Sequence, residues 1–174
     1  MDAHHDQVAR RRAELAATPP RLYFAYSTIL DSQAFDEWRT QHGYQDFRLP
    51  DSRLAEAIDL ELVYDFPSRW WGGRVAGLVD KPGAKIYGRV YEIAGADWPI
   101  LEHKEGAVTG MSVARPVQLI VDGQELAASA FTTNPGRAST EGPVSARFLE
   151  ALVRGAKSAQ LPAEYIERLK SGAR

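Results

Sequence analysis

The sequence predicts an α+β fold, in which helical segments at both ends of the chain flank a strand-rich middle. Between residues 60 and 133, five or six strand-like segments follow one another with almost no helix between them. This order favours an antiparallel or mixed, barrel-like sheet, because a doubly wound parallel sheet needs a helical crossover between strands. At 174 residues, the chain fits one domain with a substantial core.

Turn and cap signals divide the chain into elements. Asp122-Gly123 between two apolar segments is a strong hairpin signal, and Lys81-Pro82-Gly83 predicts a turn between two strands. Gly88 lies inside a predicted strand and indicates a bend or the close approach of another backbone. Asp31 or Ser32 is the expected N-cap of a helix that Gly43 closes. The predicted strands span residues 22–26, 60–66, 74–79, 86–93, 117–121 and 126–133; the predicted helices span 7–17, 32–42 and 144–157, with a last one from Pro162.

The helix at residues 7–17 is expected to form an N-terminal extension, residues 1–20, ahead of a single domain at residues 21–174. Residues 134–142 form a polar loop and a candidate mobile flap.

Composition and charge exclude several functional classes. Hydrophobic residues make up 44% and charged residues 25%, and the formal net charge of −2 comes from acids and bases mixed along the chain. No basic stripe is present for binding nucleic acid. No apolar run reaches the length of a membrane span, and no signal peptide is evident, so we expect a cytoplasmic protein without a membrane partner. The absence of cysteine excludes disulfides, thiolate nucleophiles and Cys-ligated metals.

The histidines and the arginine triplet are expected to be solvated. Two of the four histidines, His4 and His5, lie near a terminus that is expected to fray, so we expect no metal site. Arg10-Arg11-Arg12 would point in different directions on a helix, and acidic residues lie close by. A solvated helix face is therefore favoured over a binding patch.

The segment from Asp97 to Gly106 has the features of one short helix. Asp97 is the expected N-cap, Pro99 lies in the first turn, and Gly106 follows the end. Glu105 then falls in the last turn, where the helix dipole disfavours a negative charge. Partial burial there would raise its pKa, as a general base near neutral pH requires. The alternative is an exposed glutamate whose charge Lys104 offsets.

Four stretches of the sequence occur in a particular order and spacing across residues 21–170. They are Leu22-Tyr23-Phe24-Ala25-Tyr26; Trp71-Gly72-Gly73 with Pro82-Gly83; Glu105-Gly106 with Gly110-Met111; and Gly155-Ala156-Lys157 with Leu161-Pro162-Ala163-Glu164-Tyr165. Together they resemble the γ-glutamylcyclotransferase family and its AIG2-like relatives. The resemblance implies a small closed or partly closed mixed β-barrel of five to six strands flanked by helices, in a monomer or homodimer.

The resemblance also implies a reaction. Such proteins convert γ-glutamyl amino acids or amines into 5-oxoproline and the free amine, without metal or cofactor. The family's catalytic glutamate falls on Glu105, in the stretch Glu-Gly-x-x-x-Gly-Met. It would accept a proton from the substrate's α-ammonium group and return it to the leaving amine. The implied substrate-binding residues are Tyr26, Ser27, Thr28, Ile29, Leu30, Gly72, Gly73, Gly110 and Met111.

The loop after the first strand departs from the family pattern. The family reads Tyr-Gly-Ser-Asn, whereas this chain reads Tyr26-Ser27-Thr28-Ile29, although backbone N–H groups there can still hold an anion. Two expected tyrosines are replaced by Ser112 and Pro135. Two interpretations stay open. One is an active cyclotransferase for a bulkier or more apolar γ-glutamyl compound that contacts Ile29, and the other is a catalytically silent binding module on the same barrel.

Overall fold

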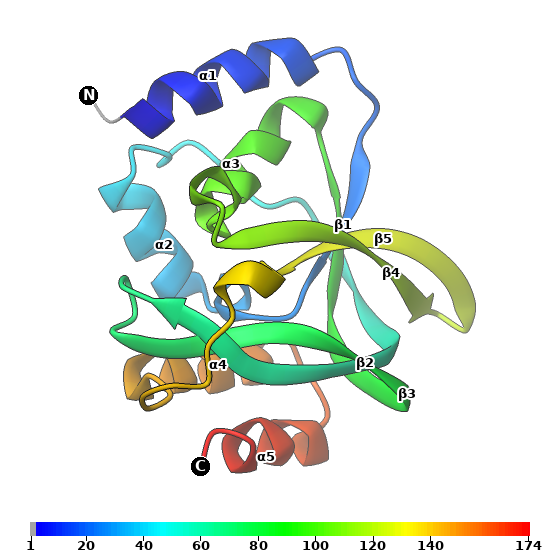
Figure 1. Ribbon diagram of the computed structural model, residues 1–174. Coiled ribbons are helices and arrows are strands. Elements are labelled where there is room, and N and C mark those ends of the chain that lie inside the picture. The colour runs from blue at the N-terminus through cyan, green and yellow to red at the C-terminus, as the bar shows by residue number, and fades with distance from the viewer. Residues whose placement is uncertain (1–2) are drawn as a thin grey trace.

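Five strands form a closed barrel in the computed structural model, which describes residues 3–174 (Figure 1). Their order around the barrel is β1-β3-β2-β4-β5. The strands are β1 (Arg21–Ala25), β2 (Ser52–Ser68), β3 (Gly73–Ile93), β4 (Ser112–Val121) and β5 (Gln124–Thr133). Neighbours pair antiparallel except β1 and β5, which pair parallel and close the barrel. The predicted mixed barrel is therefore confirmed, with five strands.

The long hairpin of β2 and β3 differs from the prediction. Lys81-Pro82-Gly83 does not separate two strands, since β3 continues through it from residue 73 to residue 93. The pairing shifts between Ile58 with Lys85 and Leu60 with Asp80, so the extra residues of β3 form a bulge opposite Asp59. The N–H of Gly83 donates to Asp59 Oδ1 at 2.8 Å. The turn residues thus bend the strand without ending it.

The predicted hairpin at residues 122–123 is confirmed. Asp122 and Gly123 have φ values of 50° and 77°, the pair of positive angles that a tight two-residue turn requires. β4 and β5 pair along their whole length on either side of them.

Helices cover the barrel on two sides (Figure 1). They are α1 (Ala3–Leu15), α2 (Ser32–Gln41), α3 (Trp98–Lys104), α4 (Ala146–Ser158) and α5 (Ala163–Ser171). The expected cap of α2 is confirmed, because the Asp31 side chain accepts a hydrogen bond from the N–H of Ala34. Within residues 3–174, no helix combines the length and the apolar character needed to cross a membrane.

Helix α1 packs against α3, and two residues of the arginine triplet contribute to the contact. Arg11 donates two hydrogen bonds of 2.9 Å to the carboxylate of Glu102 on α3, and Arg12 donates to the carbonyl oxygen of Ala96. Val8 is buried on the same helix. The expected solvated face is confirmed for Arg10 and Arg12, which are exposed, whereas Arg11 is half-buried against Glu102. The bonds of Arg11 and Arg12 also hold α1 against α3 and the segment before it.

Buried tyrosines make the stability of the barrel sensitive to alkaline pH. Burial raises the pKa of five tyrosines above the ordinary value, because a phenolate in the interior lacks hydration: Tyr23, Tyr26, Tyr64, Tyr91 and Tyr165. The folded state therefore keeps these protons above pH ~10, where the unfolded chain loses them. Their stabilising contribution is complete below that pH and is lost as the pH rises towards the folded-state pKa values.

We therefore expect the free energy of unfolding to be steady up to pH ~10 and then to fall by roughly 1.4 kcal/mol per pH unit per tyrosine. Urea unfolding between pH 8 and 11 measures this slope. The Tyr165→Phe variant, which removes one of the five phenols, should show a slope about one fifth smaller. An unfolding midpoint that stays constant to pH ~11 would contradict the prediction.

Candidate functional site

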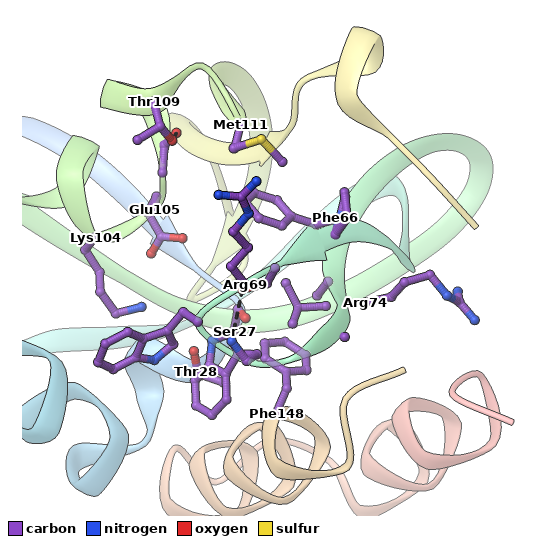
Figure 2. Close-up of a pocket in the computed structure, with 18 of the residues that line it drawn as sticks. Ser27, Thr28, Phe66, Arg69, Arg74, Lys104, Glu105, Thr109, Met111 and Phe148 are labelled. Carbon is purple, nitrogen blue, oxygen red and sulfur yellow. Dashed lines mark hydrogen bonds between the residues drawn. The ribbon is translucent and has the colours of Figure 1, made fainter. Parts of the chain in front are cut away.

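A cavity of about 840 Å³ lies between the barrel and its helices (Figure 2). It is bounded by the turn after β1, by α2, by the β2–β3 loop, by the end of α3 and the loop that follows it, and by α4. Its volume is within the range of small-molecule sites, about 300–1,000 Å³. Its walls combine aromatic rings with a few charged side chains, which is typical of a binding site.

Glu105 lies on the wall of this cavity, directly after the last residue of α3. Its Oε1 atom accepts a hydrogen bond of 2.9 Å from the hydroxyl of Tyr23 on β1. Burial and the nearby Glu105 carboxylate raise the pKa of Tyr23, so this phenol stays protonated and remains a donor. Figure 2 shows the carboxylate turned towards the interior of the cavity. The result is a half-buried carboxylate held in one orientation by a rigid strand.

The short loop after Glu105 explains the spacing Glu-Gly-x-x-x-Gly-Met. Gly106 and Gly110 both have left-handed φ values, 83° and 72°, which glycine adopts without strain. The carbonyl oxygen of Gly106 accepts hydrogen bonds from the N–H groups of Met111 and Ser112 and from the hydroxyl of Thr109. The loop therefore closes on itself, which places Met111 beside Glu105 on the cavity wall (Figure 2).

The turn after β1 contributes the opposite side of the site. Tyr26, Ser27 and Thr28 line the cavity. Ile29 and Leu30 do not, because their side chains belong to the hydrophobic core, where Ile29 is only 3% exposed. A substrate that fills the cavity would thus meet Ser27 and Thr28, and the expected contact with the Ile29 side chain has no surface to support it.

Of the glycines predicted to bind substrate, one lines the cavity and two do not. Gly73 lines the cavity, whereas Gly72 and Gly110 do not. Gly72 has a φ of 71° at the tip of the β2–β3 loop, and the carbonyl oxygen of Gly110 accepts a hydrogen bond from the Asn134 side chain. These two glycines shape loops beside the cavity and leave contact with a ligand to their neighbours.

The four histidines cluster beside the cavity, which His4, His42 and His103 line. His42 stacks on Trp38 with ring centroids 4.7 Å apart, and His103 lies within 5.8 Å of the rings of His4, His5 and His42. The expectation of solvated histidines is therefore wrong, because α1 folds back over α2 and α3. Among residues 3–174, no three His, Asp or Glu side chains have the placement to hold a metal ion.

Sequence reasoning missed several residues of the site. Tyr23 was assigned only to a buried strand, although a buried tyrosine hydroxyl needs a hydrogen-bond partner, and that rule could have directed attention to it. The other missed residues on the cavity wall come from a strand, from loops and from helices, and they include Phe66, Arg69, Lys104, Thr109 and Phe148 (Figure 2).

Comparisons with known proteins agree with this geometry. Residues 85–169 match the AIG2-like family. The human protein named gamma-glutamylcyclotransferase is 28% identical over 152 residues, which cover 86% of this chain and 77% of the human one. The bovine protein of the same name is 27% identical over 154 residues, with the same coverage. A solved structure of a gamma-glutamyl cyclotransferase superposes with a TM-score of 0.71 at 24% identity over 87% of both chains, which shows a common fold.

Proposed function

We propose that this chain, which is similar to the proteins named gamma-glutamylcyclotransferase and has their fold, releases 5-oxoproline and a free amine or amino acid from a γ-glutamyl compound. The observation that carries the proposal is the placement of Glu105. Its carboxylate, held by Tyr23, faces the same open cavity as Ser27 and Thr28. Side chains do not fill the space between them, as they would in a site that had lost its substrate.

The proposed reaction begins with a proton transfer. The substrate's α-ammonium group gives a proton to Glu105, and the resulting amine attacks the γ-carbonyl carbon of the same glutamyl group. Because the ring closes within one molecule, much of the rate gain comes from holding amine and carbonyl in contact inside the cavity. The wall formed by Ser27 and Thr28 is the proposed holder of the α-carboxylate, through the free N–H groups of its 3-10 turn.

The reaction ends when the tetrahedral intermediate collapses. The bond between the γ-carbon and the leaving nitrogen breaks as the protonated Glu105 gives its proton to that nitrogen. The ring nitrogen gives its second proton to the released amine, which leaves as an ammonium ion. Tyr23 keeps the carboxylate in place through both transfers, since its hydroxyl stays protonated. The products are 5-oxoproline and the amine. No water is consumed, and Glu105 returns to its starting state.

A panel of γ-glutamyl amino acids and γ-glutamyl amines tests the proposal, with 5-oxoproline as the measured product. We expect at least one compound to yield 5-oxoproline and free amine in equal amounts. Glutamate in place of 5-oxoproline would indicate hydrolysis and would contradict the proposed ring closure.

A silent binding module is the second candidate, and the altered loop after β1 favours it. Thr28 and Ile29 are both 3% exposed, so this loop offers a ligand fewer polar groups than the Ser-Asn pair of the family pattern. Binding of γ-glutamyl compounds in calorimetry, with no 5-oxoproline formed from any of them, would select this alternative.

A further inference from the structure

Resting on the proposed cyclotransferase activity, we propose that the cavity contains a leaving-group subsite for an aromatic α-amino acid. The aromatic ring lies against the wall formed by the β2–β3 loop and α2, and the carboxylate of the same amino acid pairs with Arg69. The preferred substrates would then be γ-glutamyl derivatives of phenylalanine, tyrosine or tryptophan.

The size and the lining of the cavity point to a large apolar group. A γ-glutamyl group is far smaller than the drug-sized ligands that pockets of about 300–1,000 Å³ accept, so much of the 840 Å³ is left for the leaving amine. Aromatic side chains dominate the part of the wall beyond Glu105, and stacked or edge-on aromatic contacts add to simple burial. These residues are Trp38, His42, Phe66, Trp70, Trp71 and Phe148.

The β2–β3 loop is held in place without any ligand. The Arg147 guanidinium and the Ser145 hydroxyl each donate a hydrogen bond of 2.7 Å, to the carbonyl oxygens of Trp70 and Trp71 respectively. The Trp71 ring meets Phe148 edge-on at 5.5 Å, and the Trp70 ring lies 5.4 Å from that of His42. The loop thus bridges α4 and α2 as a preformed wall, and a preformed wall costs little entropy when a ring binds to it.

The charges on the wall give the subsite a carboxylate-binding group. Two of the three lining cations are engaged, because the Arg74 guanidinium donates to the carbonyl oxygens of Gly142 and Tyr64 and the Lys104 ammonium lies 5.9 Å from the Trp38 ring centroid. Arg69 makes no hydrogen bond or ion pair within residues 3–174, and Figure 2 shows it reaching across the cavity. A guanidinium matches a carboxylate with two parallel hydrogen bonds.

Three substrates separate the two parts of the proposal. They are γ-glutamyl-phenylalanine, γ-glutamyl-alanine, which lacks the ring, and γ-glutamyl-phenethylamine, which lacks only the leaving-group carboxylate. We expect kcat/KM for 5-oxoproline formation from the phenylalanine compound to exceed that from the alanine compound by about 10–100-fold, as for other apolar pockets.

Two variants test the named residues. Trp70→Ala should lower kcat/KM for γ-glutamyl-phenylalanine by about tenfold and leave γ-glutamyl-alanine within about twofold. Arg69→Gln should lower kcat/KM for γ-glutamyl-phenylalanine by about tenfold and leave γ-glutamyl-phenethylamine unchanged. Arg53→Gln is the matched control, because Arg53 is an exposed arginine that pairs with Asp122 away from the cavity, and we expect it to leave kcat/KM for both substrates unchanged. If Trp70→Ala fails to fold, Trp70→Phe replaces it as the test. Because it keeps an aromatic ring, we expect it to retain the preference for γ-glutamyl-phenylalanine.

Other outcomes would overturn the inference. Equal kcat/KM for the phenylalanine and alanine compounds would refute the aromatic subsite. Equal losses of kcat/KM for the phenylalanine and phenethylamine compounds in Arg69→Gln would mean that Arg69 does not bind the leaving-group carboxylate.

If no compound yields 5-oxoproline, the proposed function fails. Calorimetry with the Glu105→Gln protein then tests the subsite by binding alone. Tighter binding of γ-glutamyl-phenylalanine than of γ-glutamyl-alanine, lost in Trp70→Ala, would support the subsite, and equal binding would refute it.

Discussion

Replacing Glu105 by glutamine is expected to lower kcat for 5-oxoproline formation by about 10²–10⁴-fold, the usual contribution of a general acid–base group. Glutamine keeps the shape of the side chain and can still accept the hydrogen bond from Tyr23, but its amide cannot take the proton from the substrate's ammonium group. We expect KM to change little, because the substrate is held by other walls of the cavity. Steady-state kinetics with the best substrate of the panel measures both constants.

The Tyr23→Phe variant tests how much the hydrogen bond to Glu105 contributes to the rate. It removes the hydroxyl that donates to Glu105 and leaves the carboxylate itself, so an intermediate loss of about tenfold in kcat is expected, the value of one hydrogen bond to a charged group. Glu102→Gln is the control, since Glu102 lies on α3, three residues before Glu105, but pairs with Arg11 outside the cavity. A Glu105→Gln protein as active as the wild type would show that Glu105 is not the base.

Replacing Gly88 by alanine is expected to destabilise the protein by roughly 3 kcal/mol, the upper end of the usual cost of overpacking. A Cβ atom on Gly88 would lie 2.2 Å from the carbonyl oxygen of Ala25 and 2.7 Å from the Phe24 ring. The ring belongs to a fully buried side chain and the oxygen to the backbone of β1, so neither can move away at low cost. Urea unfolding measures the change.

The same substitution should also reduce activity, because β1 leads directly into the Ser27 and Thr28 wall of the cavity. Gly136→Ala is the control, since its Cβ would meet only the Asn134 side chain at an ordinary 3.6 Å and should alter stability by less than about 0.5 kcal/mol. An unchanged unfolding midpoint for Gly88→Ala would mean that β1 and β3 are not packed as closely as described.

Features governed by neighbours in the chain could be predicted from the sequence. The Asp31 cap, the Asp122-Gly123 turn and the close approach at Gly88 follow rules about single residues in a local backbone conformation, and all three predictions are confirmed. The turn predicted at residues 81–83 was wrong, since the partner strand decides whether such residues end a strand or form a bulge. Here the carboxylate of Asp59 accepts the N–H of Gly83, and the pairing resumes on the far side.

In the candidate site, too, local features could be predicted from the sequence and long-range contacts could not. By itself, the sequence predicted a glutamate in the last turn of a short helix that a glycine closes, because the preferences that end a helix are local. In the structure the helix ends one residue earlier, at Lys104, and the Asp97 side chain makes no capping hydrogen bond. Only the tertiary structure decided what that glutamate can do. Barrel closure brings Tyr23 to Glu105 across 82 positions of sequence, turns Ile29 into the core and leaves Arg69 over the open cavity. Such contacts depend on how β1, α3 and the β2–β3 loop pack together, and no local pattern encodes that packing.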